Sequence, residues 1–464
     1  MPSMQSWLFA LTCVLALAPC SAVRGASEVP QNPTEGVLLS LLDGAYSADT
    51  PGACVIVVKD GEVLFRGARG MANVELGVPL HPQSVLRIGS ITKQFTAAAV
   101  LLLVREGRLS LSDPVTKYLP GYPTHGETIT IRHLLSHTSG IRSYTDIPEW
   151  RPTLRTDVSV DQLVDIFKDK PLDFAPGTRW TYSNSGYVLL GAVIERVSGQ
   201  SYAQFMRTRI FDPLGMKQTR VDVPGDVIPD RAAGYSLRDG RWMNADFLSM
   251  TQPYSAGALV SSVDDLARWN AAMENNDILT SDLWMRATTS FALSDGTPTR
   301  YGAGWMMGRL GKLATLEHSG GIYGFNGYVL RVPAEHFYVA VLANAAPSKT
   351  STRQLALQLA TTVLGISLDT PEVPVGPKHL REYVGHYAAE PEKTRHITLA
   401  GNRLRALVEG DKEFDLTPIG RDLFEARDDH SQFQFIRLNG RVSALRIEPR
   451  ITMGDRTPAR RIAD

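Results

Sequence analysis

The chain has 464 residues and a formal net charge of zero, and its apolar (43%) and charged (21%) fractions are ordinary for a globular protein. This length exceeds what one hydrophobic core usually organises, so about two domains are expected. Without net positive charge or a basic run, nothing in the sequence indicates a nucleic-acid partner or an anionic membrane surface.

The N-terminus carries an apolar stretch, residues 7–18, that is too short to span a bilayer comfortably. Small residues and a polar segment follow it, which predicts a secretory signal peptide over residues 1–25, cleaved after Ala22 or Gly25. Cleavage is favoured over lipidation at Cys20, because the proline before that cysteine fits a lipoprotein signal poorly. The mature protein is therefore expected to be periplasmic or secreted, without a transmembrane helix.

Residues 26–369 are predicted to form one α+β domain with strands at both ends, which pair antiparallel, and helices between them. A helix at 38–48 precedes a hairpin whose tight turn contains Asp60-Gly61. Residues 91–105 form a helix that is apolar nearly all round and should be buried. Further helices are predicted at 186–197, 202–210, 263–273 and 353–364, and further strands at 304–309, 314–317, 327–332 and 337–342.

The C-terminal part has a different texture. Residues 370–377 contain three prolines and are predicted to be a linker. Residues 378–464 offer only short alternating segments, typical of strands, at 396–400, 403–408, 433–438 and 442–449. We therefore expect a small all-β domain here, in the form of a barrel.

The first segment that could carry catalytic chemistry is Gly89-Ser90-Ile91-Thr92-Lys93, at the start of the buried helix. Residues three apart lie on one helix face, so Lys93 can reach the Ser90 hydroxyl. A serine nucleophile needs such a base, and burial can lower the pKa of a lysine enough for it to serve. The N–H groups at the helix start also favour a developing oxyanion.

Two other segments can complete a site. In Tyr182-Ser183-Asn184 a phenol and an amide two residues apart can both face a cleft, where the phenol passes a proton and the amide holds substrate or the lysine. His318-Ser319-Gly320-Gly321 ends a predicted strand, and its small residues let a substrate backbone pair as an extra strand. The Gly321 N–H is then a candidate second oxyanion donor.

The order and context of these three segments resemble the penicillin-recognising serine hydrolases, and among them the group of class C β-lactamases, D,D-peptidases, D-aminopeptidases and related esterases. The segments TIRHLLSHTSGI (130–141), DPLGM (212–216) and SAGALVS (255–261) are similar as well. The resemblance covers residues 38–364. The segment YVGHY at 383–387 is similar to a lipocalin-like domain that is appended to some of these hydrolases.

The resemblance implies a β-lactamase/transpeptidase-like fold, an antiparallel sheet flanked by helices with a helical subdomain facing it. It implies that Ser90 is acylated and that Lys93 accepts a proton during acylation. It also implies that Tyr182 is a base or proton relay, that Asn184 contacts substrate, and that His318 stands where β-lactamases have a lysine. No metal and no cofactor is expected in this chemistry. The expected partner is a small-molecule or peptide substrate, and the sequence gives no oligomeric state.

The third segment departs from the β-lactamase pattern, which has Lys-Thr-Gly where this chain has His318-Ser319-Gly320. An unperturbed histidine is mostly neutral at pH 7, so it attracts a substrate carboxylate poorly. The predicted activity is therefore hydrolysis, through an acyl-enzyme, of an ester or of an amide without a nearby carboxylate. A D-residue peptide remains open as substrate, and a class C-like β-lactamase or D,D-carboxypeptidase is the alternative.

Three other interpretations fit the sequence less well. His133 and His137 have the i, i+4 spacing of a zinc site, but H-E-x-x-H is absent and no further ligand cluster is near, which favours structural histidines. No serine lies in G-x-S-x-G, so the nucleophile elbow of α/β-hydrolases is missing. The third is an idle peptidoglycan- or β-lactam-binding protein, which would have no need of a proton relay.

Overall fold

The computed structural model describes residues 33–345, 350–367, 371–389, 393–408, 413–426, 431–448 and 459–462. The predicted signal peptide lies outside these residues. Within the described ranges, no helix is long and apolar enough to cross a membrane.

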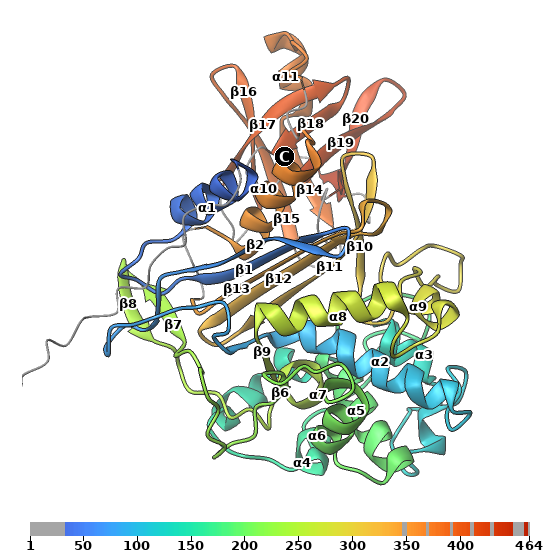
Figure 1. Ribbon diagram of the computed structural model, residues 1–464. Helices are drawn as coiled ribbons and strands as arrows, with labels where there is room; N and C mark the ends of the chain where they lie inside the picture. Colours follow the sequence, from blue (N-terminus) through green and yellow to red (C-terminus); the bar gives the residue numbers. More distant parts are fainter. Residues whose placement is uncertain are drawn as a thin grey trace, which may run out of the picture.

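The main unit, residues 33–367, is built on an antiparallel sheet with the strand order β10-β11-β12-β13-β1-β2 (Figure 1). The strands are β1 (Ala53–Lys59), β2 (Glu62–Arg69), β10 (Met306–Leu310), β11 (Leu313–Ile322), β12 (Phe325–Val332) and β13 (Phe337–Ala343). Because β1 pairs with β13 along its whole length, the two ends of the unit are joined in the middle of the sheet. The turn between β1 and β2 has positive φ at Asp60 (52°) and Gly61 (80°), as the Asp-Gly signal predicts.

Helices cover both faces of this sheet (Figure 1). One face carries α2 (Thr92–Arg105) and α8 (Val263–Asn275), and the other carries α1 (Pro33–Ala45) and α10 (Thr352–Leu364). Side chains along a strand point alternately to opposite faces. Cys54 and Ile56 accordingly enter the core beneath α2, whereas Val55 and Val57 enter the core beneath α1 and α10. Burial on both faces explains why β1 is a continuous apolar run.

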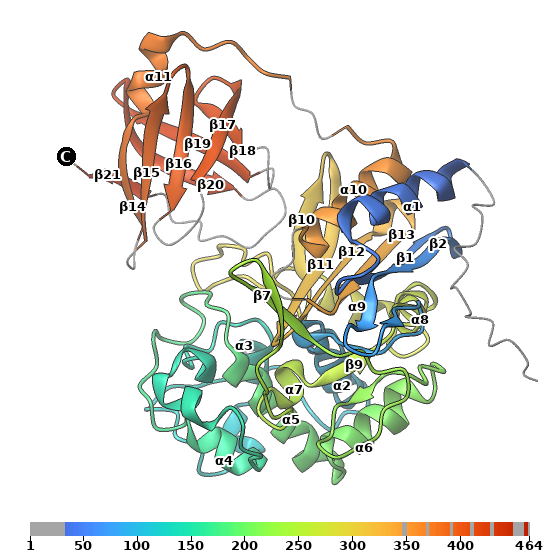
Figure 2. The ribbon, with the colours of Figure 1, turned by 90° about the vertical axis from the view of Figure 1, so that its left-hand side faces the viewer.

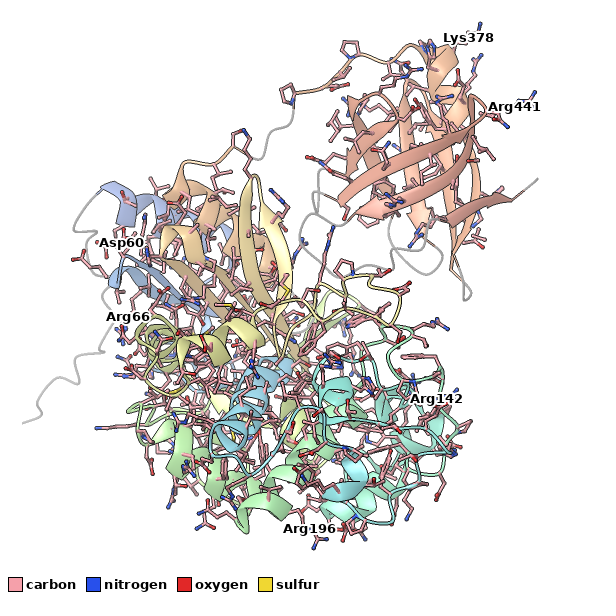
Figure 3. All side chains as sticks on the ribbon, turned by 90° about the vertical axis from the view of Figure 1, so that its right-hand side faces the viewer. Asp60, Arg66, Arg142, Arg196, Lys378 and Arg441 are labelled. Carbon is pink, nitrogen blue, oxygen red and sulfur yellow. The ribbon has the colours of Figure 1, made fainter. Side chains whose placement is uncertain are left out.

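A helical subdomain lies on the α2 side of the sheet (Figure 2). Its helices are α3 (Ile131–Leu135), α4 (Val160–Asp165), α5 (Asn184–Ser198), α6 (Tyr202–Met206), the π-helical η5 (Arg207–Phe211), α7 (Tyr254–Gly257) and α9 (Ser281–Ala287). Short 3₁₀ turns occur along the main unit at η1 (Gly89–Ile91), η2 (Val115–Lys117), η3 (Tyr144–Asp146), η4 (Pro148–Thr153) and η6 (Pro333–Glu335). Arg196, at the end of α5, marks this subdomain in Figure 3, and Asp60 and Arg66 mark the strand pair β1–β2.

Small sheets complete the main unit. The pairs β3 (Met71–Asn73) with β4 (Val78–Pro79), and β7 (Tyr235–Arg238) with β8 (Arg241–Asn244), are hairpins. A three-stranded sheet has the order β5-β9-β6, from β5 (Leu86–Arg87), β9 (Leu259–Ser261) and β6 (Arg220–Val221). It matters for the site because β5 leads directly into η1.

The C-terminal unit is a closed antiparallel barrel, as the alternating segments predict (Figure 2). Helix α11 (Pro377–Tyr383) leads into β14 (Gly385–Ala389), β15 (Lys393–Ala400), β16 (Arg403–Val408), β17 (Glu413–Gly420), β18 (Leu423–Ala426), β19 (Ser431–Leu438), β20 (Arg441–Glu448) and β21 (Ala459–Ile462). Its core contains packed aromatic rings, with Phe435 edge-to-face with Phe424 at 5.5 Å and tilted against Tyr383 at 4.7 Å between centroids. The domain boundaries at 369 and 378 stay predictions.

The helices predicted in the main unit are present, with three differences in detail. Helix α1 spans Pro33–Ala45 rather than 38–48. Helix α5 begins at Asn184 rather than at Gly186, because the Ser183 side chain caps it by accepting from the Gly186 N–H. The helix predicted at 202–210 divides into α6 and η5. The strand predicted to stop at Glu317 continues as β11 to Ile322.

Candidate active site

The segment that contains Ser90 packs closely against β11. A Cβ on Gly320 would lie 2.0 Å from the Ile88 carbonyl oxygen, and one on Gly89 would lie 2.9 Å from the Gly321 nitrogen. Gly89 also has φ = 50°, which favours glycine. The two glycines therefore let the backbone before Ser90 pack directly against β11.

Lys93, the second residue of α2, is fully buried, with no exposed surface. Its Nζ lies 3.1 Å from Ser90 Oγ, 2.9 Å from Asn184 Oδ1 and 2.8 Å from the Ala256 carbonyl oxygen. Burial holds the pKa of this amine well below its usual value of 10.5. Within the described residues, no carboxylate forms an ion pair with it.

The three neighbours of Lys93 differ in what they can accept and donate. An amide oxygen and a backbone carbonyl can only accept hydrogen bonds, whereas a serine hydroxyl can do both. A neutral amine has two hydrogens and one lone pair, so its hydrogens go to Asn184 and Ala256. The lone pair is then left for the Ser90 hydroxyl, which is the arrangement a base needs to take a proton from that serine.

Tyr182, just before α5, and Asn184, the first residue of α5, reach the same point. The Lys93 nitrogen is 4.8 Å from the centroid of the Tyr182 ring. The Tyr182 hydroxyl is buried and has no hydrogen bond of regular geometry among the described residues, yet it lies close enough to the Ser90 hydroxyl to be affected by it. Burial raises the pKa of this phenol, and the Ser90 hydroxyl opposes the rise. Asn184 is held by a bond from its Nδ2 to Thr145 Oγ1 (3.2 Å).

His137 supports this segment from behind. Its Nδ1 accepts a hydrogen bond from the Ser183 N–H at 3.1 Å, and its ring packs 4.3 Å from that of Tyr182. Burial holds the pKa of this imidazole well below 6.5, and the charge of Lys93 acts in the same direction. His137 has φ = 59° and lies beyond the end of α3, so the helical i, i+4 relation to His133 that a zinc site needs does not exist. Within the described ranges, no group of three metal-binding side chains occurs.

His318 lies on β11 without exposed surface. Its Nδ1 is 2.7 Å from the Ser319 carbonyl oxygen and must carry the hydrogen, because a carbonyl only accepts. The Tyr301 hydroxyl, 3.1 Å from Nε2, then donates to that nitrogen. Burial, with the Lys93 charge, lowers the pKa of His318 to about 3. The side chain is neutral at pH 7, and both of its nitrogens already have partners.

The end of β11 has an open edge, which we define as residues 318–322. Strand β10 pairs with β11 only as far as Glu317, so these residues are paired by β12 on one side alone. Ser319 and Gly321 are exposed and Gly320 is buried. An open edge of this kind can pair with an extended substrate backbone.

The structure thus brings the predicted residues of all three segments to one place: Ser90, Lys93, Tyr182, Asn184, His318, Ser319, Gly320 and Gly321. Three further contributors carried no assigned role in the sequence: the Ala256 carbonyl, His137 and Tyr301. The segments around Ala256 and His137 belong to the family resemblance, which could have pointed to them. Nothing in the sequence marks Tyr301.

The chain is similar in sequence and fold to known proteins. The beta-lactamase family model matches residues 39–363. Penicillin-binding protein 4* of Bacillus subtilis (strain 168) is 30% identical over 427 residues, which cover 86% of this chain and 90% of that protein. The octameric penicillin-binding protein homologue from Pyrococcus abyssi superposes with a TM-score of 0.62 at 28% identity, covering 89% of this chain and 95% of that one. A D-stereospecific amidohydrolase from Streptomyces sp. does so at 0.60 and 28%, covering 72% and 99%.

The chain belongs to the beta-lactamase family of serine hydrolases. The fold is the β-lactamase/transpeptidase-like one expected from the sequence, with a C-terminal antiparallel barrel in addition.

Proposed function

We propose that this protein is an exported serine hydrolase that forms an acyl-enzyme on Ser90 and acts on an ester or an amide, including amides of D-residues. One observation carries the proposal. Lys93 is buried, uncompensated by a carboxylate in the described structure, and 3.1 Å from Ser90 Oγ. A buried amine of this kind is costly to the fold and is expected only where a base is needed.

In the proposed acylation, Lys93 takes the Ser90 proton as Oγ bonds to the substrate carbonyl carbon. The carbonyl electron pair moves to oxygen, which accepts from the Ser90 and Gly321 N–H groups. When the carbonyl re-forms, the bond to the leaving group breaks, and Tyr182 protonates the departing atom. The proton held by Lys93 then passes to Tyr182 and restores the phenol. Water attacks the acyl-enzyme by the same steps, and the bond to Ser90 Oγ breaks to release the acid.

The directions of the pKa shifts support this division of roles. The pKa of Lys93 is lowered and that of Tyr182 is raised, so the amine is the resting base and the phenol the resting acid. Two groups whose pKa values are driven apart in one site are typical of acid–base pairs.

The proposed substrate class is based on the neutral state of His318. A substrate carboxylate is usually bound by an arginine or lysine, but His318 is neutral with both nitrogens engaged. A β-lactam or a free peptide C-terminus is therefore a poorer fit than an ester or an amide. The similarity to a D-stereospecific amidohydrolase supports the inclusion of D-residue amides.

Covalent labelling tests the proposal. The full-length protein is treated with a fluorophosphonate and the adduct is located by mass spectrometry; modification of Ser90 is expected, and none in Ser90→Ala. A panel of p-nitrophenyl esters, D- and L-amino acid anilides and nitrocefin then ranks the substrates. A folded protein that is not labelled would favour the idle binder, and nitrocefin as the best substrate would reverse the substrate assignment.

The His318→Lys variant tests the argument from charge. A lysine at this position introduces a cation, so acylation by carboxylate-bearing β-lactams is expected to speed up, by about tenfold if the new ion pair contributes about 1.4 kcal/mol. Unchanged or slower acylation would contradict the reasoning about substrate class.

A further inference from the structure

Behind Lys93, on the side away from Ser90, lies a buried row of hydroxyl groups. The hydroxyl of Tyr202, on α6, is 2.7 Å from Thr96 Oγ1, on α2. Thr96 Oγ1 is in turn 2.7 Å from the carbonyl oxygen of Ser255, on α7. Neither Tyr202 nor Thr96 has more than 1% of its surface exposed. Within the described structure, none of the three residues forms a hydrogen bond with Ser90, and the proposed chemistry does not use them.

The direction of these hydrogen bonds is fixed by what each group can do. The Ser255 carbonyl can only accept, so the single Thr96 hydroxyl hydrogen goes to it. The carbonyl oxygen of Thr92 is the other acceptor near Thr96, but it is more distant, at 3.4 Å. Thr96 Oγ1 must then accept from Tyr202. The row therefore runs from the Tyr202 O–H through the Thr96 O–H to the Ser255 carbonyl.

The turn that receives this bond also carries the acceptor of Lys93. Ala256, which directly follows Ser255, offers its carbonyl oxygen to Lys93 Nζ at 2.8 Å. The Ser255 side chain is tied to the other neighbouring helix, because its Oγ donates to the Tyr187 carbonyl on α5 at 2.8 Å. Tyr254, at the start of the turn, has φ = 39°, a strained value for a tyrosine that persists only where neighbours hold the backbone.

We propose that Thr96 and Tyr202 are positioning residues that fix the α7 turn, so that the Ala256 carbonyl holds the Lys93 amine with its lone pair directed at Ser90. This rests on the proposed function of Lys93. Two acceptors, Asn184 and Ala256, orient the amine; if one moves, the amine can rotate about its last bond. A misplacement of about 1 Å in such a group can cost about a hundredfold in rate.

Removing the row has a second, measurable consequence. A carbonyl that accepts from Lys93 stabilises the ammonium form more than the amine. Without a well-placed Ala256 carbonyl, the pKa of Lys93 falls further, and the acid limb of the pH–rate profile moves to lower pH. The other titratable groups around Lys93 are Tyr182 and Tyr187 of the α5 segment, His137 and His318, and the variants below leave all four in place.

The test uses the full chain with Thr96→Val and Tyr202→Phe, and with Thr96→Ser, which keeps the hydroxyl. Tyr383→Phe is the matched control, since it removes a tyrosine hydroxyl in the barrel. The rate of fluorophosphonate labelling of Ser90 is measured from pH 5.5 to 9. We expect a loss of about 10- to 100-fold in Thr96→Val, a smaller loss in Tyr202→Phe, and an acid limb at lower pH in both. Thr96→Ser should restore the profile.

A second readout does not depend on activity. The pH at which Lys93 takes up its proton in the folded protein can be followed from the unfolding free energy, relative to Lys93→Met in each background. A shift of this protonation to lower pH in Tyr202→Phe supports the inference even if Ser90 is never labelled. A lack of labelling would refute only the proposed function. If neither the acid limb of the labelling rate nor the pH of Lys93 protonation shifts, the inference is overturned, whether or not the rates fall. Tyr202→Phe decides alone if Thr96→Val does not fold.

Discussion

Replacement of Lys93 by methionine should change how the stability of the main unit depends on pH. In the folded protein, burial keeps the pKa of Lys93 well below the usual value of 10.5, whereas the unfolded chain holds that proton until pH 10.5 is approached. Between these two pKa values the unfolded state binds one more proton, so raising the pH favours folding. The contribution is about 1.4 kcal/mol per pH unit, and it is lost as the pH falls toward the folded pKa.

Urea denaturation of wild type and Lys93→Met at pH 7.5, 8.5 and 9.5 measures this contribution. Tryptophan fluorescence reports the main unit rather than the barrel, because six of the seven tryptophans lie in the main unit and the seventh, Trp7, lies in the predicted signal peptide. All other titrating groups are shared, so the difference between the two proteins isolates Lys93. We expect wild type to gain about 2.7 kcal/mol on the variant over these two pH units, and Ser90→Ala, which keeps the lysine, to behave as wild type. Parallel curves for wild type and Lys93→Met would refute a neutral buried lysine.

Three further outcomes are expected. Tyr182→Phe should lower turnover of a p-nitrophenyl ester by about a hundred- to ten-thousandfold without unfolding the protein, since general acid–base groups contribute that much; near-normal turnover would remove the phenol from the mechanism. Gly320→Ala should lower the midpoint of thermal unfolding, because the new Cβ would lie 2.0 Å from a backbone carbonyl oxygen, whereas Gly321→Ala meets no atom closer than 3.6 Å and should be tolerated; equal midpoints would contradict the close approach. His318→Gln should flatten the acid loss of stability: the folded pKa of about 3 lies below the unfolded 6.5, so wild type should lose about 1.4 kcal/mol more per pH unit than the variant between pH 6 and 4, and a common slope would mean that His318 titrates normally.

Much of the architecture could be predicted because it has local or periodic causes. The Asp60-Gly61 turn, the all-round apolar helix α2 and the alternating strands of the barrel each leave a pattern within ten to fifteen residues. The residues of the three site segments could be found for a similar reason, since side-chain type and spacing carry their chemistry. The three-residue spacing predicted the contact of Lys93 with Ser90 correctly, although Ser90 lies in the 3₁₀ turn η1 and α2 begins at Thr92.

The features that could not be predicted arise from long-range contacts. The sheet β5-β9-β6 contains strands of two or three residues, which are too short to show periodicity, and β5 is more than a hundred residues away from the other two along the chain. The Ala256 acceptor is a backbone carbonyl, and every residue has one. The i, i+4 spacing of His133 and His137 does not reveal that the chain leaves the helix at Leu135 and adopts a left-handed conformation at His137. Tyr301 reaches His318 only because the sheet brings the two together.

The open edge at residues 318–322 has a stereochemical consequence. A substrate that pairs with it through its main chain must be extended, and its side chains then alternate between the two faces of the sheet. At a given position, inversion of the α-carbon sends the side chain in a different direction without changing its size, charge or polarity. One face of the edge is closed by the backbone before Ser90, which approaches Gly320 too closely to admit a Cβ. The side chains of two enantiomers that pair with this edge would therefore meet different surroundings. Steric contact with the backbone before Ser90 would then distinguish one enantiomer from the other.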